Sequence, residues 1–196
     1  HLMGFSHPGS GNTKILGMDS FKDYDRILNK VGYIPGEIAL PQGLTGYQFI
    51  DMMQHMYHVN NKEMLDKMLN LFELKENELK CDTKHMSLGV KRKLAIVTAF
   101  MSDPEVLILD EPTVGLDPKQ ITEIRSLIKK LGQNHTVILS SHILSEVSQI
   151  CDRVVIINKG KLIAIDTPEH LEEKVSSNNS IYVTVEDPEN KIEGTK

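Results

Sequence analysis

The segment from Val106 to Leu109 constrains the fold more than any other part of the sequence. Its four apolar residues follow one another without a polar break, and two carboxylates, Asp110 and Glu111, come directly after them. A short continuous apolar run is typical of a strand that is buried on both faces of a parallel sheet. Such sheets bind ligands at the carboxyl ends of their strands. The sequence therefore predicts an α/β fold with a site at Asp110 and Glu111.

Two adjacent carboxylates at a strand end can divide the work of phosphate chemistry. One can hold Mg²⁺, which prefers oxygen ligands, and the other can orient a water molecule for attack on a phosphate. The alternative is an acidic strand end that is simply solvated. Pro112 has no N–H for a ladder bond and is expected to end the strand, while Pro118 is suited to the first turn of the next helix.

The longer string Leu-Asp-Glu-Pro-Thr, followed by Gly-Leu-Asp-Pro, spans residues 109–118. It resembles the Walker B motif and D-loop of ATP-binding cassette (ABC) ATPases. The resemblance implies that Asp110 holds Mg²⁺ and that Glu111 polarises the attacking water. It also implies that Asp117 positions groups across a head-to-tail dimer of two ATP-binding subunits.

A serine and a glycine, Ser87 and Gly89, precede a long helix expected to end near Met101. Ser87 could simply be the N-cap of this helix, or the free N–H groups there could bind an anion. Their position before Walker B resembles the ABC signature, in which Ser87 and Gly89 would contact ATP held by the opposite subunit. Leu88 stands where the family usually has glycine, so either its φ is not positive or the site binds phosphate less well. Residues 91–93 are expected to form a solvated basic face.

Residues 136–139, Thr-Val-Ile-Leu, predict another buried strand, and His142 follows it closely. A lone histidine after a strand is usually structural. In this order and spacing, however, His142 resembles the H-loop of ABC ATPases, which implies that it contacts the γ-phosphate of ATP.

The N-terminal part contains no phosphate loop. Residues 9–14 are rich in glycine, but no Gly-Lys-Ser/Thr string follows, and a short strand is expected instead. The resemblance implies that the chain begins inside the helix that follows Walker A, with residues 1–5 as its end. Gly36 occupies the position at which the family usually has the Q-loop glutamine, and Glu37 is either its substitute or a solvated loop residue.

Two helices are expected near residues 46–60 and 64–72, from apolar positions that recur at spacings of three and four. In the ABC family this helical subdomain docks the transmembrane subunit, although its methionines could equally be core residues. His55 and His58 lie three residues apart, and we interpret them as surface residues rather than metal ligands.

The predicted fold class is α/β, a P-loop NTPase core of the ABC type with a mostly parallel sheet and an α-helical subdomain. The core would comprise residues 1–44 and 96–175, and the helical and signature subdomain residues 45–95. Residues 176–180 read as a linker, so that residues 176–196 would begin a C-terminal extension with a strand at 181–186.

The resemblance implies an ATP-hydrolysing subunit that uses ATP and Mg²⁺ and drives a separate transmembrane permease. The variant motifs look like those of ABC-2-type exporters of drugs, antibiotics or peptides. The net charge of −5 argues against a nucleic-acid partner, and the expected location is cytoplasmic, on the inner face of the membrane through the permease. The chain alone is expected to be inactive without Walker A. The alternatives are a non-transport ABC protein of translation or DNA repair and a regulatory nucleotide-binding module.

Overall fold

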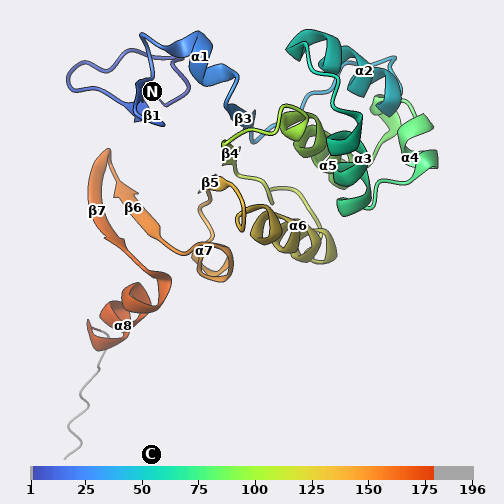
Figure 1. Cartoon of the computed structure of the whole chain (residues 1–196). Coiled ribbons are helices and arrows are strands. Elements are labelled where there is room, and N and C mark those ends of the chain that lie inside the picture. The colour runs from blue at the N-terminus through green and yellow to red at the C-terminus, as the bar shows by residue number, and fades with distance from the viewer. Residues whose placement is uncertain (1, 179–196) are drawn as a thin grey trace, which may run out of the picture. The chain divides into compact units, whose positions relative to one another are not determined.

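The computed structural model describes residues 2–178, which form two compact units (Figure 1). The first unit is His1–Glu146 and the second is Val147–Lys196. This boundary falls inside residues 96–175, a range that the sequence assigned to one core. Within the described residues, no helix combines the length and the apolar character needed to cross a membrane.

A parallel sheet of three strands, β3 (Val31–Ile34), β4 (Val106–Asp110) and β5 (Thr136–Ser140), is the centre of the first unit. Its order is β3-β4-β5, so β4 hydrogen-bonds to a strand on each side. The register pairs Asp110 with Ser140, which brings the ends of β4 and β5 to the same edge. The predicted α/β class with a parallel sheet is confirmed.

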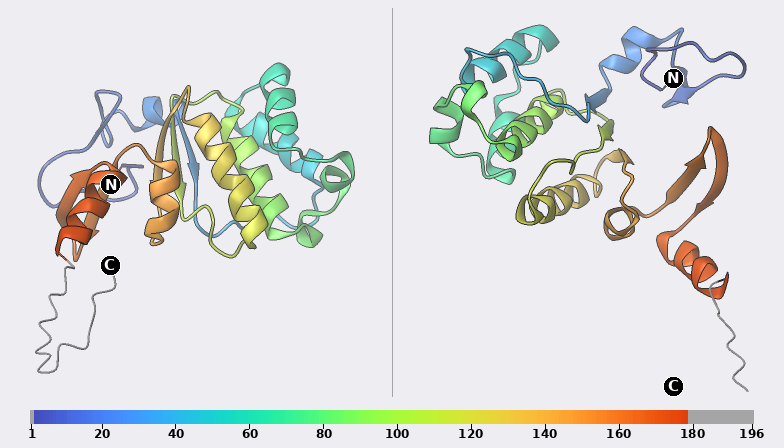
Figure 2. Two further views of the ribbon diagram at one scale, coloured as in Figure 1. Left: turned by 90° about the horizontal axis from the view of Figure 1, so that it is seen from below. Right: turned by 180° about the vertical axis from the view of Figure 1, so that it is seen from behind.

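Two long helices, α5 (Leu88–Phe100) and α6 (Pro118–Leu131), lie side by side on one face of this sheet (Figures 1 and 2). Leu107 and Leu109 of β4 are completely buried. Gly32 of β3 allows the close approach of α5, because a Cβ there would lie only 2.9 Å from the backbone oxygen of Ala99. This face of the sheet is a close-packed core of the kind that the apolar run predicts.

The other face of the sheet is only partly covered within the described residues. A small apolar cluster packs against β3 and the start of β4; its buried members are Met3, Ile15, Ile27, Val31 and Val106. On β5 no residue is buried, and Ile138 is 39% exposed. The prediction that residues 136–139 form a buried strand is therefore wrong in its burial, because β5 is an edge strand of this sheet.

Four short helical elements lie beyond α5, on its side away from the sheet (Figure 1). They are α2 (Gly46–Tyr57), α3 (Lys62–Leu71), α4 (Glu76–Lys80) and the 3₁₀ turn η1 (Thr83–His85). The predicted helices near 46–60 and 64–72 are confirmed. α2 begins at a capping box, in which the Thr45 side chain accepts a hydrogen bond from the Gln48 N–H and the Gln48 side chain accepts one from the Thr45 N–H.

The N-terminal part consists of a two-stranded antiparallel pair, β1 (Lys14–Ile15) and β2 (Met18–Asp19), followed by the short helix α1 (Tyr24–Leu28). Residues 2–5 form a turn and a bend rather than the end of a helix, although Gly4 has the positive φ of a C-cap residue. Such a short stretch contains too few backbone groups to close helical hydrogen bonds by itself.

The second unit begins within helix α7 (Leu144–Ile150) and continues with a hairpin of β6 (Val154–Asn158) and β7 (Lys161–Asp166). Lys159 and Gly160 connect these antiparallel strands with positive φ angles at both residues, as tight hairpin turns require. Helix α8 (Pro168–Asn178) continues three residues into the expected linker, and that part of the prediction is wrong. The strand expected at 181–186 lies outside the described residues.

Candidate active site

The two carboxylates at the end of β4, Asp110 as its last residue and Glu111 directly after it, lie at the carboxyl edge of the sheet, next to the end of β5. The Glu111 N–H donates to Ser140 of β5, at 3.2 Å from the backbone oxygen and 3.1 Å from Oγ. The chain therefore remains attached to the sheet for one residue beyond the end of β4. This attachment fixes where the Glu111 backbone lies relative to β5.

Ser140 also orients Asp110, because its hydroxyl donates a hydrogen bond to Asp110 Oδ1. One hydroxyl thus accepts from Glu111 and donates to Asp110. The carboxylate and the hydroxyl form a small set of hard oxygen donors, which is the ligand chemistry that Mg²⁺ prefers. Ser140 is a functional residue that the sequence motifs do not mark; its one signal is a hydroxyl at the end of the strand that neighbours the carboxylates.

Glu111 and His142 are in direct contact, with Oε1 of Glu111 3.0 Å from Nδ1 of His142. The other carboxylate oxygen of Glu111, Oε2, is buried and has no hydrogen-bond partner among the described residues. Leaving a buried acceptor unpaired is unfavourable, and such atoms are expected where a water molecule or a ligand completes the site. The Glu111 φ of 45° lies in the left-handed region, which non-glycine residues rarely adopt.

Gly36, in the loop after β3, lies beside these carboxylates. A Cβ built on Gly36 would be 3.4 Å from the backbone oxygen of Asp110 and 3.6 Å from Cβ of Glu111. The position that the resemblance assigns to the Q-loop glutamine is therefore next to the site, although glycine supplies no side chain there. Glu37 is exposed.

The other three predicted site residues form a second group around the beginnings of α5 and α6. Ser87 is the N-cap of α5, and its Oγ accepts from the Val90 N–H at 3.3 Å. Asp117 is the N-cap of α6, and its Oδ1 accepts from the Gln120 N–H at 2.9 Å. Gly89 packs against Gln120, since a Cβ on Gly89 would lie 2.7 Å from Nε2 of that side chain.

The sequence left open whether Leu88, at a position where the family usually has glycine, has a positive φ. Leu88 is the first residue of α5 and does not have a positive φ. A leucine therefore fits this position without backbone strain. Its side chain lies against Gly115, where an added Cβ would be 2.9 Å from Cδ2 of Leu88. The signature segment and the D-loop segment of this chain thus contact each other.

Arg92 contradicts the expectation that residues 91–93 form a solvated face, because it is only 1% exposed. Its guanidinium donates to three backbone oxygens, those of Glu111, Gly36 and Val114. Burial lowers the pKa of Arg92 below its ordinary value. Backbone carbonyls occur at every residue, so no sequence pattern marks this contact in advance.

A buried polar network holds the loop that follows Glu111. Thr113 Oγ1 donates to Glu146 Oε2 at 2.5 Å, and Glu146 Oε1 lies 3.2 Å from Nη2 of Arg125. Glu146 is 3% exposed. Burying a carboxylate this deeply is unfavourable unless it has such hydrogen-bond partners. The network links the loop to α6 and α7.

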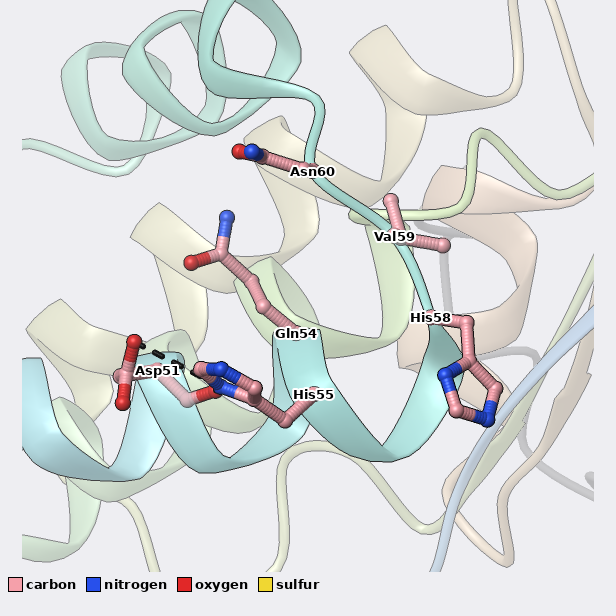
Figure 3. A pocket seen from close by; sticks show the side chains of 6 residues that line it. All are labelled: Asp51, Gln54, His55, His58, Val59 and Asn60. Atoms are coloured by element: carbon pink, nitrogen blue, oxygen red, sulfur yellow. Dashed lines mark hydrogen bonds and ion pairs between the residues drawn. The ribbon is translucent and has the colours of Figure 1, made fainter.

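An open hollow of about 280 Å³ lies elsewhere, at the C-terminal end of α2 (Figure 3). It is lined by Asp51, Gln54, His55, His58, Val59 and Asn60. The His55 Nδ1 is 2.8 Å from the Asp51 backbone oxygen, and its side chain is largely exposed. In the part of the chain that the structure describes, no group of three or more metal-binding side chains occurs, here or elsewhere.

The sheet, its flanking helices and the carboxylates at its edge define an α/β protein with the fold of an ABC ATPase domain, a P-loop NTPase fold. A solved ATP-binding subunit of an ABC transporter is similar in structure to this chain, with a TM-score of 0.76 and 26% sequence identity. The match covers 92% of this chain and 76% of the solved subunit. A family model described as "AAA domain, putative AbiEii toxin, Type IV TA system" matches residues 60–148.

The relatives define the class more narrowly. The chain is 35% identical to the uncharacterized ABC transporter ATP-binding protein YhcH of Bacillus subtilis (strain 168), over 95% of this chain and 61% of YhcH. It is 38% identical to the bacitracin transport ATP-binding protein BcrA of Bacillus licheniformis, over 88% of this chain and 57% of BcrA. The homologues of this chain are therefore ABC transporter ATP-binding proteins, and it spans about 60% of the length of these two.

Proposed function

We propose that this chain is part of the ATP-hydrolysing subunit of an ABC transporter. One observation carries the proposal: Glu111 has one carboxylate oxygen on His142, and its other oxygen is buried with no hydrogen-bond partner among the residues that the structure describes. A water molecule bound at Oε2 would be oriented by a carboxylate whose own direction is already fixed. Positioning of this kind supplies much of the catalysis of phosphoryl transfer.

Each of the clustered side chains has one task in this proposal. Asp110, oriented by Ser140, holds Mg²⁺, and Glu111 orients and polarises the attacking water. His142 contacts the γ-phosphate with its second ring nitrogen, while Nδ1 faces Glu111. Bound Mg²⁺ would supply neutralisation of the charge on the phosphates.

The second group of residues acts between two subunits. Ser87 and Gly89 lie at the beginning of α5, where free N–H groups and the helix dipole favour an anion. They contact ATP held by the opposite subunit of a head-to-tail dimer, and Asp117 positions groups across that dimer. The contact of Leu88 with Gly115 joins these two segments, which supports a common role at one interface.

The proposed task of the complete subunit is to power a separate transmembrane permease that exports drugs, antibiotics or peptides. The name of the Bacillus licheniformis relative, a bacitracin transport ATP-binding protein, supports this substrate class. The subunit would then lie on the cytoplasmic face of the membrane, attached through the permease. Affinity capture of the full-length protein should recover a membrane permease; recovery of ribosomes or DNA-repair proteins instead would contradict this assignment.

The printed sequence contains no Gly-Lys-Ser/Thr string. Such a string supplies the N–H groups and the lysine that surround the phosphates of ATP in P-loop proteins. We therefore expect the 196 residues by themselves to bind Mg-ATP weakly or not at all and to be inactive in hydrolysis.

The proposal is tested by Glu111→Gln in the full-length protein with its partner subunit. The amide keeps the size of the side chain but is a poor proton acceptor, so turnover should fall about 10²- to 10⁴-fold while ATP binding remains. Glu105→Gln is the matched control, because Glu105 precedes β4 at its opposite end and pairs with Lys30. The role of Glu111 is refuted if its variant keeps more than half of the wild-type turnover.

A further inference from the structure

Arg92 connects two loops that are far apart in the sequence, the one after β3 and the one after β4. Nη1 donates to the backbone oxygen of Glu111 at 3.2 Å. Nη2 donates to the backbone oxygens of Gly36 at 3.2 Å and Val114 at 3.1 Å. One guanidinium therefore joins the loop after β3 to the loop after β4, and it contacts the second loop at two residues, Glu111 and Val114. It projects from the first half of α5, the helix that Ser87 caps.

Burying Arg92 in this way is unfavourable if the side chain serves only to fill space. The guanidinium is buried, and within residues 2–178 its acceptors are backbone carbonyls rather than a carboxylate, while Nε has no hydrogen-bond partner there. A buried charge that lacks a counter-charge is disfavoured, and an apolar side chain of similar volume often gives equal or greater stability. The contribution of the guanidinium is therefore to hold three backbone carbonyls in fixed positions, which its planar set of N–H donors can do.

The contact of Arg92 with the Glu111 backbone supports an unusual backbone conformation. The Glu111 φ of 45° is unusual for a residue with a side chain, and such conformations persist where the surroundings hold them from several sides. Ser140 accepts from its N–H, and Arg92 donates to its carbonyl oxygen. The direction in which the carboxylate leaves the backbone is set between these two contacts.

We propose that Arg92 is a positioning residue for hydrolysis: its guanidinium fixes the Glu111 backbone relative to Gly36 and Val114 and so couples the signature helix α5 to the water-orienting carboxylate. The role of Glu111 on which this rests is the one proposed above. Because the hydrogen bonds of Arg92 within residues 2–178 go to backbone oxygens, its loss should affect the placement of Glu111 rather than the affinity for ATP.

The test compares Arg92→Met and Arg92→Lys in the full-length protein. Methionine keeps an apolar stem without donors, and lysine keeps the charge but cannot reach three carbonyls with one ammonium. Both should lower kcat per ATP-binding molecule about 10- to 100-fold, as expected for a misplaced catalytic group, with KM for ATP nearly unchanged. Lys93→Met is the matched control, since Lys93 on the same helix pairs with Glu123 at 2.9 Å and should retain kcat.

A second readout does not need hydrolysis. His142 is in contact with Glu111, so the ¹⁵N chemical shifts of its imidazole report where the carboxylate lies. Arg92→Met and Arg92→Lys should move these shifts, and Lys93→Met should not. Unchanged shifts, or a kcat within twofold of wild type in either Arg92 variant, would overturn the positioning role. A wild-type protein without ATPase activity would refute the proposed function. The His142 shifts would still show whether Arg92 fixes the position of the Glu111 carboxylate.

Discussion

The buried network around Glu146 makes a quantitative prediction about stability. Glu146→Ala removes the acceptor of the Thr113 hydroxyl, 2.5 Å away, and the partner of Arg125, 3.2 Å away. Glu146 and Thr113 are 3% and 4% exposed, so water cannot replace the lost contact between them. The Arg125 side chain is 23% exposed and can recover part of its hydration.

The two contacts contribute unequally because of this difference in exposure. A buried hydrogen bond to a carboxylate is worth about 1.5–3 kcal/mol. The partly exposed ion pair adds roughly 0.5–1 kcal/mol. We therefore expect Glu146→Ala to lower the free energy of unfolding of the first unit by about 3 kcal/mol, which corresponds to a melting temperature lower by roughly 6–12 °C for a chain of this size.

Thermal and urea unfolding followed by far-UV circular dichroism measures this change, and a double-mutant cycle isolates the Thr113 contact. Thr113→Val removes the hydroxyl, and the combination with Glu146→Ala should show a coupling energy of about 1.5 kcal/mol. Thr113→Ser keeps the donor and is the matched control, with little expected loss. A coupling energy below about 0.5 kcal/mol would show that the contact does not stabilise the loop, and the reasoning would be refuted.

Two further predictions concern close packing and nucleotide binding. Gly32→Ala would place a Cβ 2.9 Å from both the Ala99 oxygen and Cδ1 of Leu107, so unfolding should become easier by about 1–3 kcal/mol. In Gly9→Ala the new Cβ meets nothing within 4 Å, and an equal loss there would contradict the packing argument. The 196-residue chain should bind Mg-ATP weakly or not at all in titration calorimetry, because it lacks Gly-Lys-Ser/Thr; micromolar affinity would contradict this.

The elements around the site could be predicted because their signals are local. The apolar run before Asp110 marks β4, and Ser87 and Asp117 mark the beginnings of α5 and α6 as N-caps. A cap forms between residues three positions apart, so the sequence contains both partners of the hydrogen bond. Pro118 follows the same logic, since its fixed φ and missing N–H suit the first turn of a helix.

The proximity of Glu111 to His142 is a different kind of result. The sequence placed each residue after its own strand, and the resemblance to ABC ATPases suggested that they share a site. Only the register of β4 against β5 brings them to 3.0 Å, since parallel neighbours end at the same edge of a sheet. Their catalytic roles stay predictions that the kinetic experiments test.

The sequence by itself determined the strand of Val106–Leu109, the two carboxylates behind it and the capped helices, because these follow from side-chain type and short spacing along the chain. Tertiary structure alone decided that Arg92 is buried on three carbonyls, that Ser140 orients Asp110, and that β5 is an edge strand. These contacts join residues tens of positions apart, often through backbone oxygens. Every residue presents such an oxygen, so only the packing of the elements selects which of them a side chain meets.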